Sequence, residues 1–380
     1  MAEYGSNILG ISRTKLELIL RDLDVSQERA KDIFKYIHRE FITDFNFMPK
    51  ISRVLQNTLT DNYIVKPASI VKESIATDGT IKWLIDVGAN NFIETVYIPE
   101  KNRATLCISS QIGCMLNCSF CSTAKQGFNR NLSANEIIGQ LWLAQKRLYE
   151  IKDIEQPRIT NVVFMGMGEP LLNTSAVFEA ISIMNDDYAY GLSHKKVTVS
   201  TSGVVPGILE LAKIKGATLA ISMHAAYDEL RDILTPINRK YPISKLIDSL
   251  EKFVQIRSNK DKVLIEYIML KDINDSSEDA QALADILEDL PIKVNLIPFN
   301  TFPGSNYECS DDRTISEFWD NLDKRGIITT IRKTRGENIA AACGQLAGEI
   351  LDRTKRNKRY IKSMQGSITA NTNIIVSGRV

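Results

Sequence analysis

Three cysteines with the spacing C-x-x-x-C-x-x-C, Cys114, Cys118 and Cys121, carry the clearest chemistry in this sequence. Thiolates this close together can hold three corners of a cubane [4Fe–4S] cluster, which prefers sulfur ligands. The run lacks a fourth protein ligand, so one iron would stay open to a substrate or cofactor. A structural zinc site normally has four protein ligands in two separated pairs, which makes zinc the weaker interpretation. A chance group of buried thiols is weaker still.

A Gly-Glu pair follows the strand predicted over Asn161–Met165 and lies in the run from Gly166 to Pro170. An open cluster iron is what radical S-adenosylmethionine (SAM) enzymes use to bind and cleave SAM. Gly168 would let the main chain approach such a ligand, and Glu169 could accept hydrogen bonds from the SAM ammonium. An ordinary tight turn explains the pair equally well by itself. We favour SAM because the turn falls at the same end of the sheet as the cysteine loop.

Polar side chains also end the next predicted strands: Ser200 on one, Ser222, Met223 and His224 on the other. Hydroxyl and imidazole groups suit hydrogen bonds to a ribose and a carboxylate. One such residue is more often a satisfied polar group than a ligand, but three consecutive strands ending this way favour a site. Asn300 extends the ring after the sixth strand.

Three further cysteines lie outside the cluster run. Cys107 falls inside a predicted strand, and Cys343 follows the basic run Arg332–Arg335. Each taken alone is more often a small buried hydrophobic residue than a reactive thiol. If Cys343 returned over the mouth of the barrel, it could be a nucleophile whose pKa the basic residues lower. Cys309 has no such context and no assigned role.

Short apolar runs alternate with helical stretches after residue 103, which predicts a parallel sheet joined by right-handed crossovers. Six such units indicate an α/β fold with a partial (βα)₆ barrel, with a doubly wound sheet as the competing architecture. The expected strands are Ala104–Ser109, Asn161–Met165, Val197–Ser200, Thr218–Ser222, Val263–Met269 and Lys293–Ile297.

Four regions are expected along the chain. Residues 1–65, with helical periodicity over 12–47, form an accessory domain, and residues 66–103 form linking strands. Residues 104–335 form the barrel, and residues 336–380 form a closing segment. This segment contains a basic run, Arg353 to Lys362, which is followed by a sequence rich in Ser, Asn and Thr. That run is as consistent with a solvated helix face as with an RNA backbone contact.

The composition limits the class of protein without identifying it. The 380 residues are 44% hydrophobic, enough for one large domain and a smaller one, and the net charge of +1 gives no global basic field. No apolar leader or membrane-spanning run is evident. Together with thiols spaced for a metal, this predicts a protein of the reducing cytoplasm.

Five motifs in this order resemble the RlmN family of radical SAM RNA methyltransferases. They are Cys114–Cys121 with the following Ser122–Leu132, Phe164–Leu172, Val199–Pro206, Arg332–Gly336 and Ala340–Gly348. The resemblance covers the barrel and the closing segment, and extends weakly to the amino-terminal helices.

The resemblance implies methylation of adenine C2 in 23S ribosomal RNA and in transfer RNA next to the anticodon, with two SAM molecules per turnover. It implies that Cys114, Cys118 and Cys121 hold a [4Fe–4S] cluster. The SAM site would consist of Gly168, Glu169, Ser200, Ser222, Met223, His224 and Asn300. Expected partners are these RNAs and an electron donor such as flavodoxin, with no membrane and a monomeric chain.

The same resemblance gives three residues to the chemistry. Cys343 would carry the methyl group as S-methylcysteine and form a transient covalent adduct with the RNA. Cys107 would resolve that adduct by forming a disulfide with Cys343, and Glu94 would accept the C2 proton. An indirect route through a methylated cysteine is chemically reasonable, because adenine C2 is electron-poor and offers no nucleophile for direct methyl transfer.

Three other functions compete with this interpretation. The related methyltransferase of adenine C8 is the nearest, although the Gly-Glu-Pro, Arg332–Gly336 and Pro-Phe-Asn300 runs look more like the C2 family. An activase for glycyl-radical enzymes does not explain Cys107 and Cys343. A zinc-stabilised RNA-binding module without catalysis would be colourless, whereas an iron–sulfur protein would be brown.

Overall fold

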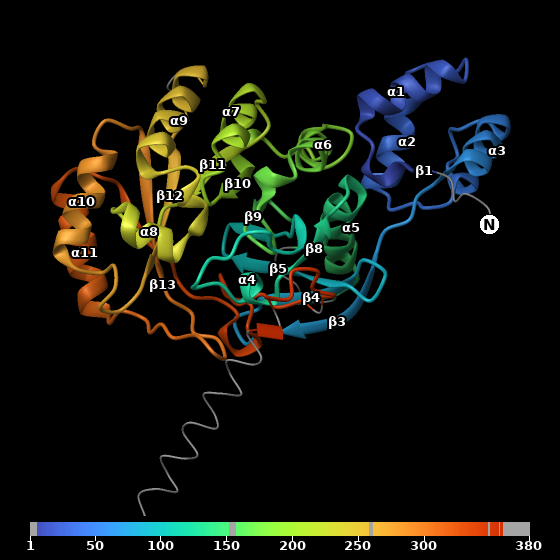
Figure 1. The fold of residues 1–380 in the computed structure, drawn as a ribbon. Coiled ribbons are helices and arrows are strands. Elements are labelled where there is room, and N and C mark those ends of the chain that lie inside the picture. Colours follow the sequence, from blue (N-terminus) through green and yellow to red (C-terminus); the bar gives the residue numbers. More distant parts are fainter. Residues whose placement is uncertain (1–5, 152–156, 258–260, 349, 357, 360–380) are drawn as a thin grey trace, which may run out of the picture.

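The computed structural model describes residues 6–151, 157–257, 261–348, 350–356 and 358–359. A long curved sheet with helices along its outer side forms most of the molecule, and a small helical lobe lies beside it (Figure 1). Lys362 and the Ser-, Asn- and Thr-rich tail fall outside the described residues.

The main sheet of the described chain contains ten strands in the order β14-β13-β12-β11-β10-β9-β6-β5-β4-β3. Its parallel part consists of β6 (Arg103–Cys107), β9 (Asn161–Phe164), β10 (Val197–Thr201), β11 (Thr218–Ser222), β12 (Val263–Met269), β13 (Ile292–Pro298) and β14 (Thr329–Ile331). An antiparallel extension adds β5 (Phe92–Glu100), β4 (Ile81–Asp86) and β3 (Ser69–Ile75). The strands expected as linkers are thus part of the same sheet.

The order of the parallel strands distinguishes the two architectures. It follows the chain from β6 to β14 without reversal. Right-handed crossovers then place every connecting helix on the same side of the sheet. A doubly wound sheet needs a reversal of order with helices on both faces. The doubly wound alternative is therefore wrong, and the partial barrel is confirmed.

The connecting helices form where apolar residues recur at helical spacing. In α9, Ile243, Leu246, Leu250 and Phe253 are buried at intervals of three and four residues. A capping box of Ser133 and Glu136 begins α5. The helices are α5 (Ala134–Glu150), α6 (Thr174–Asn185), α7 (Val205–Lys213), α8 (Asp228–Leu234), α9 (Ile243–Ile256), α10 (Ser277–Leu287) and α11 (Asp312–Lys324). No helix in the described ranges is both long and apolar enough to cross a bilayer.

The amino-terminal lobe contains α1 (Arg13–Asp22), α2 (Arg29–His38) and α3 (Arg53–Asn62), beside α5 of the barrel (Figure 1). The two-residue strands β1 (Ser6–Asn7) and β2 (Tyr63–Ile64) pair at its base. Helix α3 extends this lobe beyond the helical periodicity seen in residues 12–47.

A short antiparallel ribbon frames the cysteine loop. Strand β7 (Gln111–Gly113) pairs with β8 (Phe128–Asn131), so the chain from Cys114 to Gly127 leaves and returns at the same place. The loop includes the short helix α4 (Ser122–Gln126). Gly113 has φ 74°, and a Cβ there would lie 2.2 Å from the carbonyl oxygen of Gly127. Only glycine allows this close approach.

Candidate functional site: a thiol-lined cavity at the carboxyl ends of the strands

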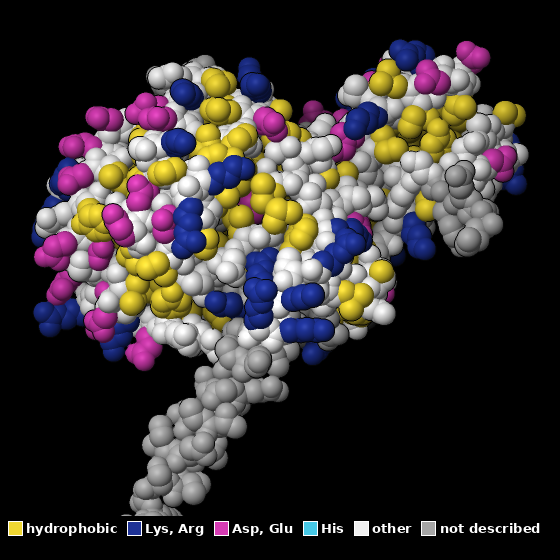
Figure 2. Space-filling view, in the orientation of Figure 1, with side chains coloured by type: hydrophobic (Ala, Val, Ile, Leu, Met, Phe, Trp, Pro, Cys, Tyr) yellow, Lys and Arg dark blue, Asp and Glu magenta, His cyan; other side chains and the backbone are white. Residues whose placement is uncertain are grey.

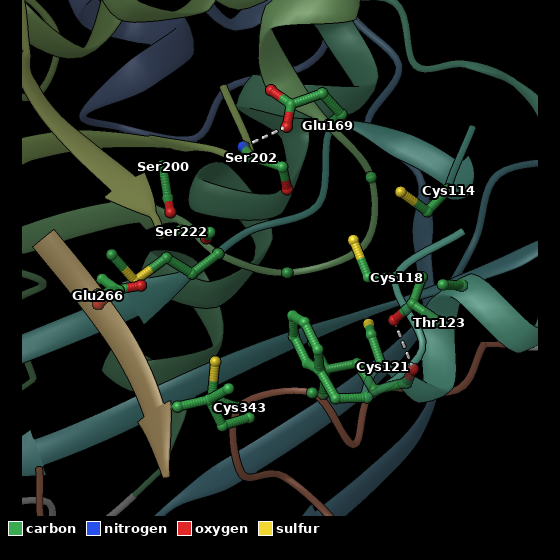
Figure 3. A pocket seen from close by; sticks show the side chains of 18 of the residues that line it. Cys114, Cys118, Cys121, Thr123, Glu169, Ser200, Ser202, Ser222, Glu266 and Cys343 are labelled. Atoms are coloured by element: carbon green, nitrogen blue, oxygen red, sulfur yellow. Dashed lines mark hydrogen bonds between the residues drawn. The ribbon is translucent and has the colours of Figure 1, made fainter. Parts of the chain in front are cut away.

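The three cysteines of the loop line one cavity at the mouth of the barrel. Figure 3 shows them on one side of this cavity, with Ser200, Ser222 and Glu266 on the opposite side and Cys343 below. We call it the cluster cavity. Its lining includes nine of the residues predicted from the sequence: Cys114, Cys118, Cys121, Gly168, Glu169, Ser200, Ser222, His224 and Cys343.

The donor set fits a cubane better than a single ion. Burial raises the pKa of all three thiols, that of Cys118 to about 12, so bound metal is needed to hold them as thiolates. Within the described residues, no three His, Cys, Asp or Glu side chains converge closely enough to hold one metal ion. A cubane instead takes each cysteine on a different iron. The arrangement therefore fits a [4Fe–4S] cluster.

Glu169 places a buried carboxylate in the cluster cavity. One oxygen accepts from the main-chain N–H of Leu171 at 3.0 Å, and the other from that of Ser202 at 2.8 Å (Figure 3). Burial raises the pKa of Glu169 to about 7. The preceding Gly168 has φ 103°, and a Cβ there would lie 2.5 Å from Gln111 Cβ. A cationic ligand such as an ammonium would hold Glu169 in its ionised form.

His224 is a neutral hydrogen-bond donor in this cavity. Burial lowers its pKa to about 3, and Nδ1 accepts from the main-chain N–H of Ile268 at 3.1 Å. The neutral ring must then carry its proton on Nε2. The ring of Phe120 packs edge-on against it, with centroids 4.6 Å apart.

Arg231 holds the strand ends together, and nothing in the sequence singled it out. Its fully buried guanidinium donates to the carbonyl oxygens of Ser202 at 2.8 Å and Met223 at 3.1 Å. These carbonyls follow β10 and β11, so one side chain fixes the spacing of both turns. Met223 itself is fully buried in the apolar core and does not line the cavity, although it was predicted as part of the SAM site.

The chain after β14 brings Cys343 back to the cluster cavity. We call residues 340–348 and 350–356 the C-terminal segment. Its main chain accepts from the cysteine loop at two points: Ser122 N donates to Gly344 O at 2.8 Å, and Thr123 Oγ1 to Leu346 O at 2.7 Å. Asn300 donates to the carbonyl oxygen of Cys343 at 3.4 Å. Asn300 thus meets Cys343 and not the cluster cavity.

A second cavity of about 560 Å³ lies on the other side of Cys343, inside the barrel. Thr105, Asn295 and Arg332 contribute to its polar lining. Cys343 and Glu266 form part of the wall of both cavities. Burial raises the pKa of Cys343 to about 11, and the guanidinium of Arg332 acts in the opposite direction.

Two predicted catalytic residues lie outside both cavity linings. Cys107 ends β6, is 7% exposed and lies near enough to Cys343 for charge on one thiol to affect the other. Glu94 on β5 binds Lys82 Nζ at 2.9 Å and accepts from the main-chain N–H of Ala347 at 2.7 Å. All six cysteines, each within the described residues, are free thiols, so the disulfide expected from the sequence is absent.

Glu266, Phe120 and Thr123 line the cluster cavity and were missed in the sequence. Glu266 had a usable signal, because it is the only charged residue in the apolar strand β12. Phe120 stands between two of the cluster cysteines, where an aromatic residue would shield the metal. No sequence pattern pointed to Thr123, because its hydrogen bond is to the C-terminal segment, which is distant in the sequence.

Comparisons with known proteins agree with this geometry. Residues 108–284 match the sequence model of the radical SAM superfamily, and residues 6–65 match that of the ribosomal RNA large subunit methyltransferase N-terminal domain. A radical SAM methyltransferase from Sphaerobacter thermophilus has a similar structure, with a TM-score of 0.82 and 36% identity. The match covers 90% of this chain and 99% of that one. Fold and site together define a radical SAM enzyme, which takes a [4Fe–4S] cluster and SAM.

The family within this class follows from a curated relative. The dual-specificity RNA methyltransferase RlmN of Pseudomonas fluorescens (strain SBW25) is 47% identical over 356 residues, which cover 94% of this chain and 93% of the relative. The chain belongs to the RlmN family of radical SAM RNA methyltransferases.

Proposed function

We propose that this enzyme methylates C2 of a specific adenine in 23S ribosomal RNA and in transfer RNA next to the anticodon, with Cys343 as the methyl carrier. One observation carries the proposal: Cys343 belongs to the wall of two cavities at once. A residue that takes a group from a cofactor on one side and delivers it to a base on the other must have this position.

The cluster cavity provides ligands for both cofactors. Cys114, Cys118 and Cys121 would hold the cluster, and Glu169 would accept from the ammonium of SAM. Ser200 and Ser222 offer hydrogen bonds from the opposite wall (Figure 3), and His224 offers one from beside Phe120. When bound, the cluster supplies the electron that cleaves SAM, and SAM supplies the methyl group and the radical-forming chemistry.

Arg332 prepares Cys343 for methylation. A thiolate is the reactive form, and burial alone would keep this thiol protonated at neutral pH. The Arg332 guanidinium faces Cys343, Cys107 and Glu266 in the same region, with Glu266 Oε1 at 4.0 Å. We expect S-methylation of Cys343 to become faster as pH rises toward 9, because a larger fraction of the thiol is then ionised.

The second cavity would receive the target base. Its volume accommodates a purine ring, and Glu266 and Asn295 offer groups for the base edge. The base must first leave its stack in the RNA, at a cost of a few kcal/mol. Glu94 would accept the C2 proton once the Cys343 methylene carbon is attached.

Cys107 would then release the product. Its thiolate attacks the sulfur of Cys343, the bond from that sulfur to the methylene carbon breaks, and this carbon takes a proton to become the new methyl group. An external thiol reductant restores the free thiols seen in the structure.

RNA contact is expected near the cysteine loop. Figure 2 shows Lys and Arg side chains gathered on the face next to the point where the described chain ends. Exposed basic residues there are Arg353 and Lys355 of the C-terminal segment, and Lys358 and Arg359 just beyond it. The C-terminal segment lies along β8, with Arg353 N donating to Phe128 O at 3.0 Å. These residues would hold the phosphate backbone while a cytoplasmic carrier such as flavodoxin supplies electrons to the monomeric enzyme.

The test uses anaerobically reconstituted enzyme with SAM, dithionite and transcripts of a ribosomal RNA fragment and a transfer RNA. We expect 2-methyladenosine and 5′-deoxyadenosine, identified by chromatography and mass spectrometry, only when reductant and SAM are both present. Formation of 8-methyladenosine would assign the chain to the C8 reaction instead. 5′-Deoxyadenosine without any methylated base in either RNA would contradict the proposed substrate.

A further inference from the structure

Arg356, in the last described turn of the C-terminal segment, extends inward to the cysteine loop. Its guanidinium donates to the carbonyl oxygens of Leu116 at 2.6 Å, Ala124 at 3.3 Å and Met115 at 3.4 Å, and also to that of Cys114. The other basic residues of this run, Arg353, Lys355, Lys358 and Arg359, are exposed, whereas Arg356 is half-buried. One member of a run predicted to face either solvent or RNA is thus turned toward the cluster ligands.

The four carbonyls lie on both sides of the thiol run. Cys114, Met115 and Leu116 belong to its start, whereas Ala124 follows Cys121. The β7–β8 ribbon joins the ends of the loop further out, at Gly113 and Phe128. A planar guanidinium has five N–H donors in a fixed fork, so it can bind several carbonyls at once, which a lysine ammonium cannot do with the same geometry.

We propose that Arg356 is a positioning residue for the iron–sulfur cluster, which closes the cysteine loop by binding its main-chain carbonyls from both sides. A short loop with three thiols must hold them in one arrangement before the cluster can assemble. Each bond from Arg356 removes main-chain freedom from that loop, which reduces the entropy lost when the cluster binds. The inference concerns cluster binding and does not depend on which RNA the enzyme methylates.

The same bonds couple the cluster to the methyl carrier. Arg356 and Cys343 belong to one segment, and this segment also fixes the loop through Asp352, whose Oδ1 accepts from Phe128 N at 3.3 Å and from Thr354 N at 2.7 Å. Loss of the Arg356 contacts should therefore loosen the segment and the loop together. The guanidinium also places a positive charge beside Cys114, and local charge and hydrogen bonds tune the reduction potential of such clusters.

The experiment compares Arg356→Gln and Arg356→Lys with Lys358→Gln, an exposed neighbour in the same turn. Reconstituted enzyme is exposed anaerobically to an iron chelator, and iron release is followed by absorbance. We expect Arg356→Gln to lose iron about tenfold faster than the parent, because hydrogen bonds from a charged group are lost. The rate of iron release from Arg356→Lys should lie between those of the parent and Arg356→Gln, since lysine keeps the positive charge but lacks the forked donors of the guanidinium. Lys358→Gln should release iron at the parent rate.

Two further readouts separate this role from general instability and from RNA binding. In the cluster-free protein, proteolysis between residues 114 and 124 should be faster for Arg356→Gln while the melting temperature stays close to that of the parent. The electron paramagnetic resonance spectrum of the reduced cluster with SAM should change for Arg356→Gln and not for Lys358→Gln. If Arg356→Gln keeps parental iron release and spectrum but binds RNA more weakly, Arg356 is a phosphate contact and the proposal is wrong. An Arg356→Lys variant with parental iron release would likewise refute the requirement for the fork.

Discussion

The two ends of the chain are attached to the barrel by different kinds of contact. The amino-terminal lobe shares one continuous apolar cluster with the barrel, to which it contributes residues such as Leu9, Phe34 and Ile37. At their interface, Phe41 packs edge-on against Trp142, with ring centroids 5.2 Å apart. The C-terminal segment adds only two buried residues to that cluster, Ala341 and Leu346.

Polar bonds to the main chain hold the C-terminal segment instead. Glu94 accepts from Ala347 N, and Asn91 Oδ1 accepts from Leu351 N at 3.0 Å. Gln345 Nε2 donates to Thr301 O at 2.8 Å. Hydrogen bonds of this kind exchange with water at a small net free-energy difference, whereas separating an apolar interface exposes its whole area. We therefore expect the lobe to be harder to detach from the barrel than the C-terminal segment.

Removing the thiol of Cys343 should have the largest effect. We expect Cys343→Ser to lower formation of 2-methyladenosine at least about a thousandfold, because no other group can carry the methyl between the cavities. Mass spectrometry of digested RNA measures this, and absorbance should show that the cluster is retained. Cys309→Ser is the matched control and should keep parental activity. Methylation by Cys343→Ser at the parental rate would exclude the carrier role.

Variants of Glu94 and Lys82 can distinguish a role of Glu94 in proton transfer from a role in attaching the C-terminal segment. If Glu94 accepts the C2 proton, Glu94→Gln should lower the rate about a hundredfold or more, which is the usual size of base catalysis. Lys82→Met leaves the carboxylate in place and removes only its partner and the bond from Lys82 Nζ to Ala340 O, 3.0 Å long. We expect a smaller loss, with faster proteolysis of the segment. Equal losses in both variants would mean that Glu94 only attaches the segment.

The sequence predicted those parts of the site that depend on local spacing. Three cysteines in eight residues and polar groups at successive strand ends define their geometry almost alone, since parallel strands bring their carboxyl ends to one edge. The six barrel strands were found for the same reason, as short apolar runs. The side chain of Met223 lies in the core and not in the cavity, because successive side chains at a strand end point to opposite faces; its place in the SAM site stays a prediction.

The remaining interactions join residues far apart in the chain. The bond from Ala347 to Glu94 spans 253 positions, and that from Arg356 to Leu116 spans 240. No periodicity or motif encodes such pairs. Arg356 also stood in a run of basic residues whose composition suggested solvent or RNA, and only the fold shows that one of them points inward.

Stability should respond more strongly to a change at the amino-terminal lobe than at the segment. Phe34 is 1% exposed, and Phe34→Ala should lower the free energy of unfolding by about 3–5 kcal/mol because it leaves a cavity. Thr123→Val removes the bond to Leu346 O at nearly constant volume and should cost about 1 kcal/mol. Urea denaturation of cluster-free protein measures both. Equal values would remove the distinction between an apolar and a polar attachment.

Acid should weaken the lobe through His38. This side chain is buried against Phe34 and Tyr190, and burial lowers its pKa to about 3 from an ordinary value of 6.5. The folded protein keeps it neutral, whereas the unfolded chain binds a proton below pH 6.5. The stabilisation is therefore complete above pH 6.5 and decreases as pH falls toward 3, by at most about 1.4 kcal/mol per pH unit.

The buried, neutral His224 of the barrel also makes the protein less stable as pH falls. The contribution of His38 must therefore be measured as the difference between the parent and a His38 variant. Between pH 6.5 and 4.5, His38→Phe should lose less stability than the parent in urea denaturation. Parallel curves over this range would show that His38 is not held neutral by the lobe. A difference would locate an acid-sensitive point in the apolar attachment, since the polar attachment of the C-terminal segment contains no histidine among its described residues.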